Sequence, residues 1–261
     1  MTKVQSQNDN PVYSADRSLY GKLRRRVARL MYRRPVRGCT LEAPMLSFAF
    51  DDAPRSAALT GAQLLEDAGA RGTYYINAGL FGQDGPMGPY TLAEDVQKLA
   101  EAGHEIGCHT FSHLDCGKAP GQAIRADIEA NATALSALGV PPMSTFAYPY
   151  GDVSPQAKQA LDGRFALLRG LHHGVIQTGS DLNQAPAVGI EGPKGEEIAR
   201  FYLERVKTEG GWLILYSHDV QNKPSEWGCT PEALRRLIDA AGPCQIVTVA
   251  EGARRLAESR A

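Results

Sequence analysis

From residue 40 onward, short apolar runs that resemble β-strands alternate with longer segments of helical periodicity. The strand-like runs are MLSFAF (45–50), GTYYIN (72–77), EIGCH (105–109), STFAYP (144–149), RFALLR (164–169), WLILYS (212–217) and QIVTV (245–249). The helix-like segments lie near 57–69, 91–103, 120–139, 153–163, 194–209, 230–241 and 249–259. This alternation predicts parallel β/α units and hence the α/β class. The sequence has neither a dinucleotide-binding glycine fingerprint nor a phosphate-binding loop motif, so these seven units favour closure into a barrel.

The length and composition are those of one enzyme-sized globular domain. The chain has 261 residues, of which 43% are apolar and 22% charged, and an α/β barrel needs about 250 residues. The cysteines are odd in number and include no C-x-x-C pair, which indicates a reducing compartment: Cys39, Cys108, Cys116, Cys229 and Cys244. No signal peptide and no apolar run of membrane-spanning length are visible. We therefore expect a cytoplasmic protein.

Positive charge is concentrated at the start of the chain, although the net charge of the whole chain is −1. Residues 1–37 contain ten Lys or Arg and only two Asp. We assign residues 1–40 to a basic N-terminal arm and residues 41–261 to the barrel. Within this arm, apolar residues recur at helical spacing between the basic ones, and Pro35 is expected to end the helix. These apolar residues are Leu19, Leu23, Val27, Leu30 and Met31.

Two interpretations of this amphipathic segment remain open. In the first, it binds an anionic surface, with lipid headgroups at the inner membrane face favoured over nucleic acid, which we do not expect as a partner. In the second, it is an ordinary helix that packs its apolar stripe on the barrel. The first interpretation predicts a cytoplasmic protein held peripherally at the membrane.

Charged and imidazole side chains follow two of the predicted strands. MLSFAF is followed by Asp51 and Asp52, and EIGCH ends at His109, with His113 four residues further along. Two adjacent carboxylates at a strand end repel each other unless a cation compensates them, although one Asp is also explained as a helix cap before Pro54. Asp52, His109 and His113 together would form a three-ligand site of the catalytic zinc type, which leaves a coordination position for water.

These motifs, in this order, resemble those of the polysaccharide deacetylases with a NodB homology domain, which form carbohydrate esterase family four. The resemblance extends from about residue 44 to 250 and rests on four segments: AFDD (49–52), HTFSH (109–113), AYPYG (147–151) and SHD (217–219). It implies a distorted (β/α)7 barrel and metal-dependent hydrolysis of N-acetyl groups on sugars. By position, it implies that Asp51 is the general base, His218 the general acid, and the Tyr150 backbone N–H a donor to the oxyanion. The same transfer implies a divalent metal ion, most consistent with Zn²⁺, on Asp52, His109 and His113.

The chain also departs from the family pattern. Ala147 stands where members of the family commonly have an arginine that holds the base, and the usual acidic and tryptophan residues of the fourth motif are not visible. Arg169, at the end of RFALLR, is a candidate for the missing cation. His172, His173 and Asp181 are candidates for the fourth-motif roles.

We interpret the chain as a metal-dependent carbohydrate N-deacetylase, a hydrolase of amide bonds. Its expected substrate is an N-acetylated polysaccharide of the N-acetylglucosamine type or a lipid-linked precursor, and a holdfast or other exopolysaccharide pathway is the closest family role. Trp227, in the polar loop after His218, is a candidate for stacking on a sugar ring. Two alternatives stay open: a non-catalytic, membrane-associated glycan-binding or scaffold protein on the same fold, and a barrel hydrolase of a small non-sugar amide.

Overall fold

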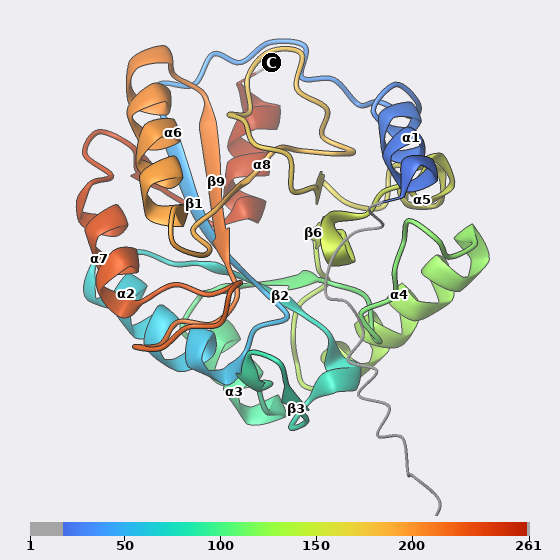
Figure 1. Ribbon diagram of the computed structural model, residues 1–261, viewed down its shortest axis with the longest axis horizontal. Coiled ribbons are helices and arrows are strands. Elements are labelled where there is room, and N and C mark those ends of the chain that lie inside the picture. The colour runs from blue at the N-terminus through green and yellow to red at the C-terminus, as the bar shows by residue number, and fades with distance from the viewer. Residues whose placement is uncertain (1–17, 260–261) are drawn as a thin grey trace, which may run out of the picture.

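The computed structural model describes residues 18–259 and is built around one curled parallel sheet (Figure 1). The strands are β1 (Met45–Asp51), β2 (Thr73–Ile76), β5 (Glu105–Cys108), β6 (Thr145–Ala147), β7 (Leu167–Arg169), β8 (Val188–Gly189), β9 (Trp212–Ser217) and β10 (Gln245–Ile246). Their order is β7-β6-β5-β2-β1-β9-β8, and β10 pairs with the start of β1. A small antiparallel hairpin, β3 (Asp84–Gly85) and β4 (Gly88–Pro89), lies apart from the sheet. Because β7 and β8 lie at the two ends of this order, the sheet forms a half barrel.

Helices connect the parallel strands and surround the sheet (Figure 1). They are α1 (Leu19–Ala28), α2 (Ala62–Asp67), α3 (Ala93–Glu101), α4 (Gly121–Ser136), α5 (Pro155–Leu161), α6 (Gly195–Glu209), α7 (Pro231–Asp239) and α8 (Val249–Glu258). A π-helical turn (Ala57–Gly61) precedes α2, and single 3-10 turns occupy Ala78–Leu80 and Pro149–Gly151. Side-chain oxygens of Ser154, Thr230 and Thr248 cap α5, α7 and α8, which satisfies backbone N–H groups that a helix start leaves unpaired.

Strand β1 shows why the sheet must be covered on both faces. All seven of its residues are buried. Leu46, Phe48 and Phe50 belong to one apolar cluster, and the alternate residues Met45 and Ala49 belong to another. Successive side chains of a strand point to opposite faces, so β1 separates two hydrophobic cores.

The fold confirms the predicted α/β class and barrel-type parallel sheet. Each of the seven predicted strand segments contains an observed strand, and WLILYS corresponds to β9 residue for residue. The short strand β8 and the β3–β4 hairpin were not predicted. Among residues 18–259, no helix is long and apolar enough to cross a membrane.

The N-terminal segment is attached to the fold at several points. Helix α1 ends at Ala28, seven residues before Pro35, and the carbonyl of Ala28 accepts a hydrogen bond from the buried Lys158 Nζ at 2.9 Å. Beyond the helix, the backbone N–H of Val36 donates to the carbonyl of Ser180 at 2.8 Å. Val36 itself is buried. The segment from Ala28 to Val36 therefore contributes to the packing of the described fold.

Candidate active site

Neighbouring strands bring the predicted ligands to one edge of the sheet. Strands β5, β2 and β1 are adjacent and parallel, so their carboxyl ends lie together. Asp52 directly follows β1, and His109 directly follows β5. Asp52, His109 and His113 each offer one ligand atom, and these atoms lie within 4.8 Å of one another. The structure therefore brings together the three residues predicted to bind a metal ion.

The donor set fits a divalent cation. His109 Nε2 and His113 Nε2 lie 3.5 and 3.3 Å from Asp52 Oδ1. Within the described part of the chain, neither buried carboxylate oxygen of Asp52 accepts a hydrogen bond, so a cation would satisfy both. His109 Nδ1 lies 2.8 Å from the carbonyl of Ala147. A partner on this ring nitrogen orients Nε2 toward the cluster, as is usual for histidines that bind metal ions. Two imidazoles and one carboxylate suit Zn²⁺ and similar ions.

Burial keeps the two histidines in the form that binds metals. It lowers the pKa of His109 and lowers that of His113 to about 4, although the nearby carboxylate of Asp52 opposes the shift in both cases. An imidazole is a ligand only when it is neutral. Both side chains are therefore neutral near pH 7 without any cation to displace their protons.

The loop that carries the two histidines is held by backbone hydrogen bonds. The N–H groups of Phe111 and Ser112 donate to Asp127 Oδ2 at 2.7 and 3.0 Å. His109 and His113 therefore reach the cluster from a tight loop. Asp127, on α4, fixes the path of this loop from outside the cluster.

Several residues around the cluster have a strained backbone. Positive φ angles occur at Asp52 (56°), Ala53 (39°), Thr110 (65°), His113 (57°) and Tyr150 (57°). Residues with a Cβ atom rarely adopt this left-handed region, and such strain tends to gather at functional sites. The ring of Tyr150 packs edge-on against His113, with centroids 4.3 Å apart. The loop predicted to stabilise an oxyanion thus lies directly beside a candidate ligand.

Arg169 is paired with the predicted base. Its Nη2 contacts both carboxylate oxygens of Asp51, and both side chains are buried. Strands β6 and β7 place Arg169 beside Ala147 in register, so the guanidinium reaches Asp51 from the strand next to the position where the family pattern has its arginine. Burial alone would raise the pKa of Asp51, but the charge and hydrogen bond of Arg169, together with His109 and His218, more than compensate and lower this pKa below its ordinary value. Asp51 is therefore held ionised.

His218, directly after β9, is oriented by two acceptors. Its Nδ1 lies 3.1 Å from Glu191 Oε1 and 3.2 Å from the carbonyl of Trp227, which also accepts the His218 backbone N–H at 3.1 Å. Burial alone lowers the pKa of His218, but Glu191, with Asp51 and Asp52, more than compensates and raises it to about 9. Protonated His218 is thus favoured.

Sequence reasoning missed Glu191 and offered other residues for its role. Asp181 contacts Lys158 Nζ at 2.6 Å and accepts the backbone N–H of Arg34 at 2.8 Å. His173 packs edge-on against Tyr202. The signal for Glu191 was weak, because it follows a strand of only two residues, β8, that cannot be recognised in the sequence.

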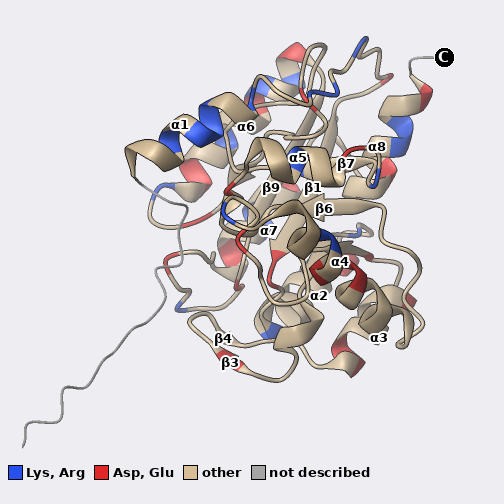
Figure 2. Ribbon diagram, turned by 90° about the vertical axis from the view of Figure 1, so that its right-hand side faces the viewer, with Lys and Arg blue, Asp and Glu red and all other residues tan. Residues whose placement is uncertain are grey.

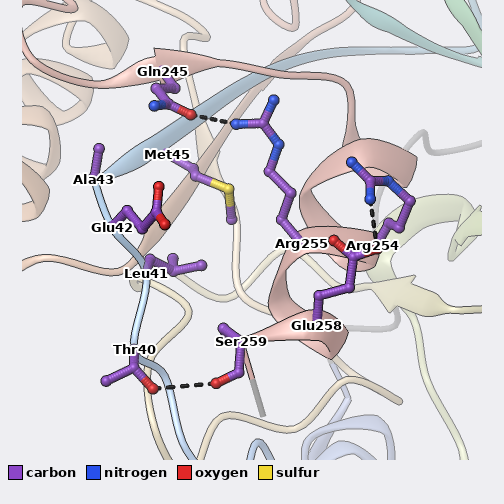
Figure 3. A pocket seen from close by; sticks show the side chains of 10 residues that line it. All are labelled: Thr40, Leu41, Glu42, Ala43, Met45, Gln245, Arg254, Arg255, Glu258 and Ser259. Atoms are coloured by element: carbon purple, nitrogen blue, oxygen red, sulfur yellow. Dashed lines mark hydrogen bonds and ion pairs between the residues drawn. The ribbon is translucent and has the colours of Figure 1, made fainter. Parts of the chain in front are cut away.

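Of two cavities, one borders the candidate active site and the other does not. One, of about 540 Å³, is lined by Ile190 and Gly192, which flank Glu191, and by Glu226 and Gly228, which flank Trp227. It therefore borders the His218 region. The other, of about 440 Å³, lies at the opposite end of β1 against α8 (Figure 3). Arg254 and Glu258, which line it, form an ion pair, and its position at the other end of β1 separates it from the candidate active site.

Comparisons with known proteins point to one family. Residues 39–163 match the polysaccharide deacetylase family. A chitin deacetylase of Arthroderma benhamiae is 29% identical over 83 residues, which are 32% of this chain and 21% of that protein. The match thus spans about a fifth of the relative's length.

Two solved structures share the fold. The chitin deacetylase of Colletotrichum lindemuthianum has a TM-score of 0.59 at 16% identity, over 84% of this chain and 91% of its own. A family 4 acetyl xylan esterase of Clostridium thermocellum, solved with a cobalt ion, has a TM-score of 0.56 at 21% identity, over 80% and 89%. Residues 39–163 of this chain are thus similar to the polysaccharide deacetylase family, and the described chain shares the fold of the two solved structures.

Proposed function

We propose that this protein is a metal-dependent N-deacetylase of carbohydrates. The observation that carries the proposal is the meeting of three groups at one edge of the sheet: the Asp51–Arg169 pair, the Asp52–His109–His113 cluster and His218. Hydrolysis of an acetamide needs a base for water, a stabiliser for the oxyanion and an acid for the departing nitrogen. Each of the three groups suits one of these requirements.

Asp51 is proposed as the general base. It is buried, ionised and separated in role from its neighbour Asp52, because Arg169 binds Asp51 while Asp52 faces the histidines. Asp51 accepts a proton as the water oxygen forms a bond to the acetyl carbon. Arg169 orients this carboxylate with two contacts and keeps it ionised until the proton arrives.

His218 is proposed as the general acid. It donates its Nε2 proton to the sugar nitrogen as the C–N bond breaks, which releases acetate and a free amine. Glu191 and the carbonyl of Trp227 hold the other ring nitrogen, so the ring presents Nε2 in a fixed direction. The backbone N–H of Tyr150 is proposed as a donor to the oxyanion.

Asp52, His109 and His113 are the residues that would hold the divalent cation. When bound, such an ion supplies positive charge that acidifies water and polarises an acyl oxygen. In this role the two buried histidines stay neutral, and Asp52 carries one negative charge. The Ala147 carbonyl holds His109, and the Asp127 carboxylate holds the loop that carries both histidines.

The proposed substrate is an N-acetylated sugar of the N-acetylglucosamine type, in a polysaccharide or its lipid-linked precursor. The names of the related chitin deacetylases support a glycan substrate. Trp227 is half-buried and lies between two residues that line the 540 Å³ hollow beside His218. We propose that its indole stacks on a sugar ring there. A holdfast-type or other exopolysaccharide pathway, with the enzyme at the inner membrane face, is the setting we propose for this reaction.

The test is acetate release from N-acetylglucosamine oligomers by purified protein whose metal content is measured. Acetate release that disappears on chelation and returns with Zn²⁺ supports the proposal. Binding of the oligomers without acetate release would instead support a glycan-binding protein. Activity confined to small non-sugar amides, or to O-acetylated xylan oligomers, would overturn the assignment to N-acetylated glycans.

Replacing His218 with alanine should lower turnover by about 10²–10⁴-fold, the usual contribution of one acid–base group. Metal content should not change, because His218 is outside the ligand cluster. The matched control is His173→Ala, since His173 is an exposed histidine that packs edge-on against Tyr202. Equal turnover in the two variants would make His218 a structural residue.

The Glu191→Gln variant should move the alkaline limit of activity to lower pH. As an acid, His218 works only while protonated, so activity is present below its pKa of about 9 and is lost as pH rises through that value. Glutamine removes the negative charge, and the pKa should fall toward the ordinary value of about 6.5. The measurement is kcat against pH, with Glu226→Gln in the same region as the control. A profile identical to that of the parent would show that Glu191 does not set the protonation of His218.

A further inference from the structure

Helix α1 is attached to the barrel by its charged side. Its buried residues are Gly21 and Ala28, whose small side chains allow close approach. Arg24 Nη2 and Arg25 Nη1 reach the fully buried carboxylate of Asp152 at 2.5 and 3.1 Å. At 100° per residue, these four helix residues occupy one side of the helix.

The apolar side of the same helix faces outward. The exposed fractions are 84% at Leu19, 60% at Leu23 and, in the turn that follows, 79% at Leu30. Tyr20 and Met31 are also exposed. The alternative in which the apolar stripe packs on the barrel is therefore wrong, because these side chains are largely exposed. A cluster of exposed leucines beside a tight polar attachment is typical of an interaction surface.

Basic residues border the exposed leucines. Lys22, Arg26 and Arg29 are exposed and follow the helix along one flank of the apolar stripe. Residues 18–37 contain no Asp or Glu, and Figure 2 shows Lys and Arg concentrated on α1. Apolar side chains flanked by cations match the boundary of an anionic bilayer, where headgroups meet acyl chains.

We propose that residues 19–33 form a docking surface for an anionic lipid bilayer. Leu19, Leu23 and Leu30 enter the acyl boundary, while Lys22, Arg26 and Arg29 contact the headgroups. Because Arg24 and Arg25 hold α1 on the barrel, the helix can contact a bilayer while it stays attached to the rest of the protein. An apolar protein groove would accept the leucines equally well, but it would not explain a flank of cations with no acidic residue.

The attachment point relates this surface to the candidate active site. Asp152 follows Tyr150 by two residues, in the loop that contacts His113. Docking would therefore hold that loop close to the membrane, where a lipid-linked glycan is presented. This consequence rests on the proposed function, whereas lipid binding itself does not.

The experiment is co-sedimentation of the full chain with vesicles of phosphatidylcholine, with and without phosphatidylglycerol. Binding is expected only to the anionic vesicles, and it should weaken between about 0.1 M and about 1 M salt because the charges are screened. Replacing Lys22, Arg26 and Arg29 with glutamine should weaken partitioning by about 100-fold, since one basic residue contributes about fivefold. Replacing Leu19, Leu23 and Leu30 with serine should abolish it.

Matched controls come from other faces of the molecule. Phe201→Ser removes a side chain that is 64% exposed on α6, and a Lys98→Gln, Lys223→Gln, Arg235→Gln triple variant makes the same change in net charge at exposed positions. Neither control should alter sedimentation, and acetate release from soluble oligomers should persist in every variant.

Equal binding to neutral vesicles, or unchanged binding by the leucine variant, would overturn the proposal. So would light scattering that shows a dimer which the leucine variant dissociates, because the stripe would then be covered by a second copy. Circular dichroism of each variant distinguishes lost docking from lost folding. Truncation is less suitable, because it would leave the buried Asp152 without its arginines.

Discussion

The Asp51→Asn variant is expected to lose activity by about 10²–10⁴-fold while it retains its metal ion. An amide cannot accept the proton of water, whereas Asp52 and the two histidines are unchanged as ligands. The measurement is acetate release together with metal content of the same preparation. Parallel loss of metal and activity would contradict the division of roles between the two adjacent carboxylates.

The Asp51→Asn substitution also leaves Arg169 buried without its counter-charge, which is expected to lower the free energy of unfolding by about 3–5 kcal/mol. A double variant, Asp51→Asn with Arg169→Met, removes both charges. Stability should recover in the double variant, because replacing a buried ion pair by apolar groups is often neutral. Activity should not recover. Recovered activity would show that the single variant failed through folding and that Asp51 is not the base.

The ligand cluster could be predicted because its residues follow strongly apolar strands. MLSFAF is apolar and buried along its whole length, as is typical of a strand inside a parallel sheet. Its apolar composition therefore predicts both the strand and the position of its carboxyl end. Residues after such a strand must lie at the sheet edge, and the same reasoning places His109 and His218. Arg169 was placed at this edge in the same way, and the register of β6 and β7 brings it beside Ala147.

Glu191 could not be predicted in the same way. Its strand, β8, has two residues, Val188 and Gly189, and pairs in parallel with Leu215 and Tyr216 toward the C-terminal end of β9. Tertiary pairing rather than local apolar pattern creates that strand. Neither the strand nor the acidic residue after it could therefore be recognised before the position of β9 was known.

Helix α1 was predicted, but its orientation was not. The apolar period of Leu19, Leu23 and Leu30 indicates a helix with one apolar side, and it does not say which side the barrel contacts. Asp152 decides the orientation, since this fully buried carboxylate needs cations and Arg24 and Arg25 supply them. The partner is 127 residues or more away in the sequence, so no local pattern contains it.

The His113→Ala variant is expected to lose both metal and activity. Two remaining protein ligands hold Zn²⁺ poorly. Replacing a residue that only hydrogen-bonds to a ligand costs about 10–100-fold in metal affinity. Loss of a ligand itself should therefore lower the affinity by more than about 100-fold. His109→Ala should behave in the same way and should also leave the Ala147 carbonyl without its imidazole partner. Metal content after dialysis and a competition titration with a chelator give the affinity directly.

His104→Ala is the matched control, because His104 is also a buried histidine but lies outside the cluster. Its Nε2 contacts Glu66 at 3.0 Å and its Nδ1 accepts the N–H of Gly72 at 2.9 Å. The His104 variant should be less stable yet keep its metal, whereas the His113 variant should lose metal at a temperature where it is still folded. Activity of the His113 variant should return in part at high Zn²⁺, because weakened binding is overcome by mass action. Normal metal content in both the His109 and His113 variants would exclude these residues as ligands, and a His104 variant without metal would show that folding, not ligation, controls occupancy.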